Sequence, residues 1–377
     1  MLDPILEYLT DHRREMVGEL QTFVEQESPS LDKALLDRTA EWLRTVLEGA
    51  GAAVEMVPQT KTGNHLIARW PGQVEAEPLL LLCHYDTVFP EGTLARRPFL
   101  VNEGRVRGPG VFDMKTGYIQ ALWAIRSLFA AGEGPRRPLV LVSNSDEEIG
   151  SGSSRALIEE ETRKARAVLV FEASQDGKVK TGRKGTAFYH LEIEGRAAHA
   201  GLEPERGVSA IVELATQIQV VGSLADVARG TTVNVGTVRG GTRSNVIAAQ
   251  AEADIDVRFA EAGEAERVDR AMCALSPYLP GSLIRVTGGK SRPPLERSEG
   301  VLELFSRAHA VAERLGFPLG EAQVGGSSDG NFSAALGVPV LDGLGAVGDG
   351  AHADHEFADL VSMPLRAALA AHLMAEL

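Results

Sequence analysis

One apolar run in this chain ends abruptly in a polar pair: Leu79-Leu80-Leu81-Leu82-Cys83-His84-Tyr85-Asp86-Thr87. Four leucines and a cysteine in succession predict a short strand that is buried on both faces. Open α/β sheets form their sites at the carboxyl ends of such strands, so we expect His84 to be a metal ligand and Asp86 to be its hydrogen-bond partner. The alternative is a surface histidine at an ordinary strand end.

The length and composition indicate a globular protein of two domains. The chain has 377 residues, of which 44% are hydrophobic and 24% are charged. A chain of this length exceeds the usual size of a single core. Its formal net charge of -14 argues against nucleic acid as a partner, because phosphate binding requires a basic surface.

The composition also predicts a cytoplasmic location. The first residues lack the basic and apolar regions of a secretion signal, and the sequence has no apolar run of the roughly 20 residues that a membrane span requires. Cys83 and Cys273 are expected in core elements, which disfavours a disulfide framework. We therefore expect a soluble cytoplasmic protein that does not associate with membranes.

Acidic residues follow two further predicted strands. Residues 138–145 are followed by Asp146-Glu147-Glu148, and residues 167–171 are followed by Glu172. If three parallel strands end at one edge of a sheet, these carboxylates form a cluster with His84, and their repulsion and desolvation must be offset. A divalent metal ion is the simplest compensation.

A glycine-rich segment supplies one more candidate ligand. Asp113 lies in Gly110-Val111-Phe112-Asp113-Met114-Lys115, where a predicted helix begins that runs to about residue 131. An N-cap would account for Asp113 by itself, but not for the glycines that precede it. The long loop of residues 88–110 lies between His84 and Asp113, so we expect it to help form the site.

The element pattern changes midway along the chain. The predicted order is strand, helix, strand, strand, helix, strand, at residues 187–194, 206–223, 232–238, 249–259, 262–275 and 282–287. This is the order of a split-βαβ, ferredoxin-like α+β module. Turn-like pairs at Thr181-Gly182 and Gly288-Gly289 predict its boundaries. We therefore predict an α/β domain from residues 1–181 and 290–377, into which residues 182–289 are inserted as a second domain.

Four motifs resemble those of the M20 metallopeptidases, in the same order along the chain. They are His84-Tyr85-Asp86-Thr87-Val88, Gly110-Val111-Phe112-Asp113-Met114-Lys115, Ser145-Asp146-Glu147-Glu148-Ile149-Gly150-Ser151 and His352-Ala353-Asp354-His355-Glu356-Phe357. The resemblance covers nearly the whole chain and is closest to the glutamate carboxypeptidases of the carboxypeptidase G2 type. It implies a zinc-peptidase catalytic domain with a mixed central sheet flanked by helices, and an inserted lid and dimerisation domain.

The resemblance implies a pair of zinc ions, with Co²⁺ or Mn²⁺ as alternatives. The implied ligands are His84 and Glu172 for one ion, Glu148 and His352 for the other, and Asp113 as the bridge between them. Imidazole and carboxylate groups suit Zn²⁺. His352 is preferred to His355 because the ligand in the family is the first histidine of His-x-x-His-Glu-Phe. A cis peptide bond is expected at Asp113-Met114.

Three further residues are implied to act in catalysis. Glu147 matches the general base, which takes a proton from the attacking water and returns it to the leaving amine. Asp86 would fix the tautomer of His84. His199, in Gly195-Arg196-Ala197-Ala198-His199-Ala200-Gly201, would reach the active site of the other subunit and polarise the scissile carbonyl. The alternative for His199 is a polar residue in a bend.

The resemblance also implies residues that bind substrate. Asn245 and Arg258 match positions that contact the terminal carboxylate of the substrate, and Arg292 is a further candidate, since an arginine fork suits a carboxylate. Gly326 and Ser327 lie in a glycine-rich turn whose backbone N–H groups would bind an anion. A solvated surface arginine is the alternative for Arg258 and Arg292.

Together these features predict an enzyme that hydrolyses an amide bond and releases a C-terminal amino acid from a small peptide or N-acyl amino acid. An N-acyl-amino-acid deacylase or an aminopeptidase-type enzyme is the alternative, because Arg183-Lys184-Gly185 resembles features of those branches. A metal-binding homologue without catalysis is a third hypothesis, and the presence of Glu147 argues against it. The resemblance implies a homodimer that forms through the inserted domain.

Overall fold

The computed structural model of the chain describes residues 3–132 and 134–377, which form two compact units. The first unit contains the residues up to Thr181, together with Arg297–Val324 and Ser328–Leu377. The second unit contains Gly182–Glu296 and Gly325–Ser327. Among the described residues, none of the helices has both the length and the apolar character that crossing a membrane requires.

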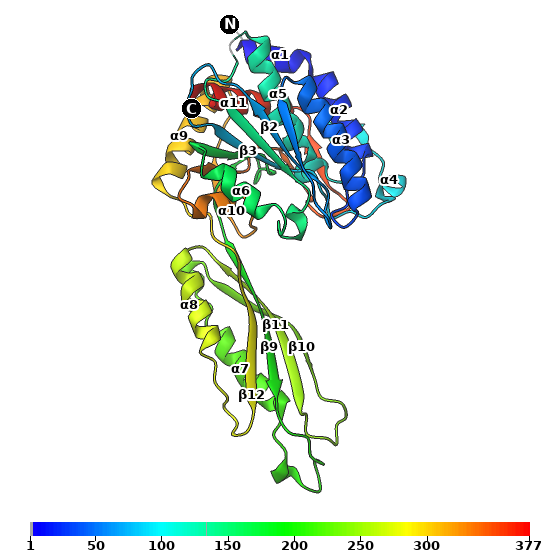
Figure 1. Cartoon of the computed structure of the whole chain (residues 1–377), viewed down its shortest axis with the longest axis vertical. Coiled ribbons are helices and arrows are strands. Elements are labelled where there is room, and N and C mark those ends of the chain that lie inside the picture. Colours follow the sequence, from blue (N-terminus) through cyan, green and yellow to red (C-terminus); the bar gives the residue numbers. More distant parts are fainter. Residues whose placement is uncertain (1–2, 133) are drawn as a thin grey trace. The chain divides into compact units, whose positions relative to one another are not determined.

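A mixed sheet forms the centre of the first unit, and helices flank it (Figure 1). Its described strands, in order across the sheet, are β1 (Ala53–Val57), β2 (His65–Trp70), β6 (Leu139–Asn144), β3 (Leu79–His84), β7 (Ala167–Val170) and β14 (Val340–Leu341). β6, β3, β7 and β14 run parallel, whereas β1 and β2 are antiparallel to their neighbours. The predicted α/β class with a mixed central sheet is therefore confirmed.

The central strands are buried because helices cover both faces of the sheet. Every residue of β3 and of β6 is buried, as their continuous apolar runs predict for parallel strands. The helices of this unit are α1 (Pro4–Asp11), α2 (Arg13–Glu25), α3 (Lys33–Gly49), α4 (Thr93–Arg96), α5 (Thr116–Ala130), α6 (Arg155–Thr162), α9 (Glu299–Leu315), α10 (Gly330–Ala335) and α11 (Ser362–Glu376). α5 is buried almost all around, since it packs on β3, α11, α1 and α2.

Two smaller sheets complete this part of the chain. The strands of the first are β15 (Gly348–Asp349), β16 (Phe357–Asp359), β5 (Arg105–Arg107) and β4 (Leu100–Asn102). The second pairs β13 (Glu321–Val324) with β8 (Val179–Arg183). β4, β5 and the short helix α4 lie in the segment expected to be a long loop, so this segment is partly structured.

The second unit is an α+β module. Its elements are β9 (Gly185–Glu194), α7 (Ala210–Gly222), β10 (Thr232–Gly240), β11 (Gln250–Phe259), α8 (Ala262–Cys273) and β12 (Leu283–Arg292), with short 3₁₀ turns at Pro204–Arg206 and Val227–Arg229. The sheet is antiparallel in the order β10-β11-β9-β12, which is the ferredoxin-like arrangement. Inward residues of β11 alternate with more exposed ones because helices cover one face.

Residues 4–25 form two helices, which separate at His12. Two local expectations are corrected. Gly288 and Gly289 form no turn, because they lie within β12 at positive φ, and a Cβ at Gly288 would lie 2.1 Å from the carbonyl oxygen of Phe188. The glycines therefore permit a close strand approach, and β12 continues past the boundary expected at residue 289. Cys83 is buried as expected, whereas Cys273 is exposed.

Candidate active site

The ends of three parallel strands bring the candidate site together. β3 lies between β6 and β7, and all three run in the same direction, so their carboxyl ends share one edge of the sheet. His84 is the last residue of β3, Glu147 and Glu148 follow β6 in a 3₁₀ turn, and Glu172 follows β7. The apolar runs determine the strands, and the strand direction determines which polar ends meet.

Two groups of side chains at this edge share one aspartate. In the first group, Nε2 of His84 lies 3.3 Å from Oδ1 of Asp113 and 3.5 Å from Oε1 of Glu172. In the second group, Nε2 of His352 lies 3.0 Å from Oε2 of Glu148 and 3.4 Å from Oδ2 of Asp113. In each group, one ligand atom from every residue lies within 4.8 Å of the others. Asp113 thus offers one oxygen to each group.

The electrostatics of both groups favour bound positive charge. The pKa of His352 is raised to about 10 because Asp113 and Glu148 accept hydrogen bonds from its ring. Burial opposes protonation of His84, but hydrogen bonds to Asp113 and two other carboxylates raise its pKa well above the ordinary value. Burial likewise opposes ionisation of Asp113, yet hydrogen bonds from the two histidines hold the pKa of this carboxyl well below its usual range.

The carboxylate of Glu148 is not fully hydrogen-bonded by the surrounding side chains. Its Oε1 atom is buried and has no hydrogen-bond partner among the described residues. Burial raises the pKa of Glu148 to about 6. A buried carboxylate oxygen without a donor is costly. Two imidazoles and three carboxylates form the donor set that divalent zinc accepts, so the residues present fit a pair of metal ions.

Asp113 is held in an unusual backbone segment. Val111–Lys115 forms a kinked helical turn in which Asp113 and Met114 have non-helical φ and ψ angles. The peptide bond between them is cis, as the resemblance to the M20 metallopeptidases implies. α5 begins after this segment, and its N-cap residue is Lys115. The alternative that Asp113 is the N-cap of this helix is therefore wrong.

Asp86 links three parts of the site through one buried carboxylate. Nδ1 of His84 lies 3.3 Å from Oδ1 of Asp86 and 3.1 Å from the backbone carbonyl oxygen of the same residue. The same carboxylate accepts hydrogen bonds from the backbone N–H groups of Glu147 and Glu148, both at 3.3 Å. Ser30 donates to Oδ2 at 2.7 Å. Asp86 therefore orients both His84 and the turn that carries the two glutamates.

The structure also distinguishes the two histidines of the last motif. The Nε2 atom of His352 lies in the second group, whereas the side chain of His355 is exposed and is in neither group. His352 has a positive φ of 61°, which directs the chain sharply at this residue. Glu147, the candidate base, is half-buried at the start of the 3₁₀ turn, directly before Glu148.

Two candidate residues of the second unit lie together at one end of its sheet. His199 pairs with Val246, and the N–H of Ala200 donates to the carbonyl of Asn245. Nδ1 of His199 accepts from the N–H groups of Gly201 and Leu202, each at 3.1 Å. Nε2 must then carry the ring proton of the neutral imidazole and is a donor.

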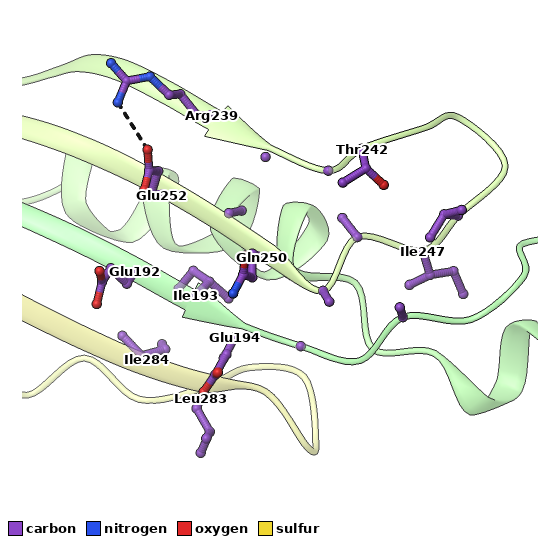
Figure 2. Close-up of a pocket in the computed structure, with 18 of the residues that line it drawn as sticks. Glu192, Ile193, Glu194, Arg239, Thr242, Ile247, Gln250, Glu252, Leu283 and Ile284 are labelled. Atoms are coloured by element: carbon purple, nitrogen blue, oxygen red, sulfur yellow. Dashed lines mark hydrogen bonds and ion pairs between the residues drawn. The ribbon is translucent and has the colours of Figure 1, made fainter.

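A cavity of about 920 Å³ lies at the same end of this sheet (Figure 2). Thr242 and Ile247 from the loop after β10 border it, together with Gln250 and Leu283 at the strand ends. The ion pair between Arg239 and Glu252 lies at its margin. All its lining residues belong to the second unit, so the candidate metal ligands do not border it.

The two candidate arginines lie at the other end of the sheet. Arg258 and Arg292 are both paired with Thr186 across β9. Arg258 is held by Asp256, with Nε–Oδ1 and Nη2–Oδ2 distances of 2.7 and 2.8 Å, whereas Arg292 is buried. Asn245 and Arg258 flank opposite ends of β11, whose ten residues span about 30 Å.

Gly326 and Ser327 contribute acceptors to the second unit. Their carbonyl oxygens accept hydrogen bonds from Nη1 of Arg183, at 3.4 and 3.1 Å. The expected N–H cradle for an anion at this turn remains a prediction.

Sequence reasoning assigned no role to two buried residues that contact the site. Ser30 binds Asp86, and Glu356 accepts hydrogen bonds from the backbone on either side of Phe112. Ser30 lies outside the four motifs that the sequence offers. Glu356 lies within the His352–Phe357 motif, so its position in that motif was the available signal.

Comparison with known proteins identifies the family. The model of "Peptidase family M20/M25/M40" matches residues 80–376. The chain belongs to this family of metallopeptidases. Carboxypeptidase G2 from Pseudomonas sp. (strain RS-16) is 32% identical over 379 residues, which cover 98% of this chain and 90% of that protein.

Solved structures of M20 proteins share the fold. Aminopeptidase PepT from Bacillus cereus ATCC 10987 is 23% identical, covers 97% of this chain and 98% of its own, and gives a TM-score of 0.79. The YXEP protein from Bacillus subtilis, described as a dinuclear metal binding peptidase of the M20 family, is 16% identical, covers 97% and 98%, and gives a TM-score of 0.67. The M20 assignment thus agrees with the shared fold and with paired groups of candidate ligands.

Proposed function

We propose that this M20 peptidase uses two zinc ions to hydrolyse an amide bond and release a C-terminal amino acid, as a glutamate carboxypeptidase does. The observation that carries the proposal is the pair of ligand groups that share Asp113, with Glu147 directly beside them. His84 and Glu172 would hold one ion, and Glu148 and His352 the other. The similarity to carboxypeptidase G2 supports the carboxypeptidase direction.

In this mechanism the protein supplies the base and the orientation. When bound, a metal pair lowers the pKa of water and polarises the scissile carbonyl. Glu147 takes the proton of the attacking water and later gives it to the leaving amine. Asp86 holds His84 through Nδ1, so that Nε2 faces Asp113 and Glu172. His199 donates a hydrogen bond from Nε2 to the developing oxyanion.

The placement of the substrate-binding residues supports a site that two chains complete. Asn245 and Arg258 lie at opposite ends of β11, so one substrate carboxylate cannot contact both residues of the same module. We therefore propose that Arg258 and Arg292 bind the substrate carboxylate in the site of their own chain. His199 and Asn245 then come from the partner chain.

The surface of the inserted module supports a homodimer. β10 is one of the two edge strands of its sheet, and unpaired edge strands are ready to pair with another chain. On α7, next to β10, the apolar side chains of Ile211, Val212 and Val220 are 47%, 52% and 43% exposed. An exposed apolar strip beside an open strand edge suits a second copy of this module.

The test combines metal analysis with replacement of the proposed base. The wild-type chain should contain about two zinc ions and hydrolyse N-acyl glutamates and dipeptides. Glu147→Gln should keep both ions and lower kcat by roughly 10²–10⁴-fold, because it removes the proton acceptor and no ligand. Metal content by plasma emission and turnover on a substrate panel provide the measurements.

A matched control makes this test specific. Glu160→Gln removes an exposed carboxylate on α6 that pairs with Lys164, so it should leave turnover unchanged. Unchanged turnover in Glu147→Gln would show that another residue acts as the general base. A fully active protein without metal would refute the metal mechanism. A preference for amino-acid amides that carry a free N-terminal amine and no carboxylate, over substrates with a free C-terminal carboxylate, would instead favour the aminopeptidase-type alternative.

A further inference from the structure

We propose that Glu356 is a positioning residue that sets the distance between His352 and Asp113 and thereby forms the second metal group. This inference rests on the proposed function, because it assigns a role within the same site. The buried Glu356 carboxylate lies between the two loops that carry these ligands. Glu356 itself is in neither ligand group.

The carboxylate of Glu356 binds the backbone of the segment that carries Asp113. Oε1 accepts hydrogen bonds from the N–H groups of Phe112 and Asp113, at 2.9 and 3.1 Å, and Oε2 accepts from Gly110 at 2.9 Å. Glu356 is 1% exposed, so water does not compete for these bonds. The position of Asp113 is therefore tied to that of Glu356.

The same residue is rigidly connected to His352. Residues 350–356 join β15 and β16, which pair as an antiparallel hairpin through Gly348–Ala358 and Asp349–Phe357. Inside this loop the N–H of Ala353 donates to Gly350 and the N–H of Glu356 donates to Ala353. β16 in turn pairs with β5. His352 thus lies in a short closed loop that ends at the Glu356 anchor.

Arg97 also binds the loop of residues 350–356. Its Nη2 donates to the carbonyl of Ala353 at 3.1 Å and lies 4.0 Å from Oε2 of Glu356. Its Nη1 lies 3.4 Å from Asp354, and its guanidinium stacks on the ring of Phe89 at 4.7 Å. Arg97 therefore holds the loop to the segment before Asp113, independently of the three backbone N–H groups.

An amide cannot replace this carboxylate without conflict. All three backbone groups that face Glu356 are donors, and Arg97 beside them is also a donor. A glutamine has one acceptor oxygen, and its NH₂ group would face a donor. Glu356→Gln therefore keeps the size of the side chain but weakens the link between the two loops.

The test measures zinc binding to the full-length protein rather than turnover alone. Wild type and variants are stripped of metal, titrated with Zn²⁺ by calorimetry, and checked by Co²⁺ absorption spectra. Glu356→Gln should weaken the second ion by about 10–100-fold and the first ion less. The second group loses the placement of both His352 and Asp113, whereas the first group shares Asp113 but keeps His84 and Glu172 in position. Its kcat should fall with metal loss and recover at high Zn²⁺.

Glu213→Gln is the matched control. Glu213 is also fully buried and accepts from the backbone N–H groups of Tyr278 and Leu279, but it belongs to the second unit. This variant should lose stability and keep both zinc affinities. If Glu356→Gln does not fold, Arg97→Lys carries the test, and its second zinc affinity should also fall.

The outcomes separate this inference from the proposed function. A wild-type chain that binds no zinc pair refutes the proposed function itself. A wild-type chain that binds two ions, with Glu356→Gln or Arg97→Lys retaining both affinities, refutes the positioning role alone. Equal weakening of both ions in these variants also refutes it, since a general loss of structure would then explain the effect.

Discussion

Single buried charged side chains hold together segments of this protein that are distant in sequence. Asp86 accepts from Ser30 and from the backbone of Glu147 and Glu148, so one side chain positions residues that are distant in sequence. Arg366 shows the opposite case, because its buried guanidinium donates to several backbone carbonyls and desolvation lowers its pKa to about 10. Backbone groups thus satisfy much of the hydrogen-bonding capacity of these two buried side chains.

Glu264 in α8 should make the stability of the second unit depend on pH. Arg267, Thr231 and Arg229 donate to its carboxylate and lower its pKa to about 2. A depressed pKa stabilises the fold above the unfolded pKa of about 4.3, and this contribution is lost as pH falls toward 2. Urea unfolding at pH 7, 5 and 3 should show that Glu264→Gln costs about 1.5–3 kcal/mol at pH 7 and less at pH 3.

An exposed carboxylate on the same helix is the control for this prediction. Glu266 pairs with Arg270 at 3.8 Å, and both side chains are largely exposed. Glu266→Gln should therefore change stability little at any of these pH values. A cost for Glu264→Gln that stays constant from pH 7 to pH 3 would contradict the pKa assignment.

At the scale of elements, β3 joins the fold to the site. Leu81 of β3 lies in register with Leu141 of β6 and Leu169 of β7, and all three are fully buried. The same strand ends at His84. The rigidity of this layer is therefore what places the first candidate ligand.

Leu81→Ala should destabilise the first unit by about 2–5 kcal/mol, because it leaves a cavity in the closely packed sheet layer. Urea unfolding of the full-length chain in chelator gives this value without a contribution from metal binding. Leu100→Ala is the control, since Leu100 is 53% exposed on β4 and should change stability by about 0.5 kcal/mol or less. A similar cost for both variants would show that β3 is not the stabilising centre.

At the scale of the whole molecule, the proposed dimer predicts complementation between inactive variants. His199→Ala and Glu147→Gln chains should each be nearly inactive alone. After mixing and exchange, about a quarter of wild-type activity should return, since half of the dimers are mixed and each has one intact site. The measurement is turnover after mixing, with formation of mixed dimers verified by two affinity tags.

Self-mixtures of each variant supply the control and should stay inactive. If mixed dimers form and activity does not return, the site is complete within one chain. A wild-type chain that remains monomeric by sedimentation at assay concentration would also contradict the proposed assembly.

The sequence by itself determined the family, the mixed α/β class and the strands that carry the acidic ends. These features depend on local patterns: a run such as Leu79–Leu82 is apolar whatever surrounds it, and the motifs around His84, Asp113 and Glu147 are contiguous. The sequence also predicted the order of elements in the inserted module, because each element has a local pattern of its own. In β11, for example, apolar and polar residues alternate along a single strand. Its expected turn at Gly288-Gly289 was wrong, since glycine composition does not distinguish a turn from a close strand approach.

Only the tertiary structure decided which distant residues meet. Glu356 accepts hydrogen bonds from the backbone around Asp113, which is more than 240 positions away in the sequence. Ser30, between α2 and α3, donates a hydrogen bond to Asp86. Asn245 and Arg258 are near in sequence, yet they lie at opposite ends of a strand. Such relations follow from sheet order, strand direction and burial. Contacts between distant segments set these features, so neither segment alone shows a sequence pattern that predicts them.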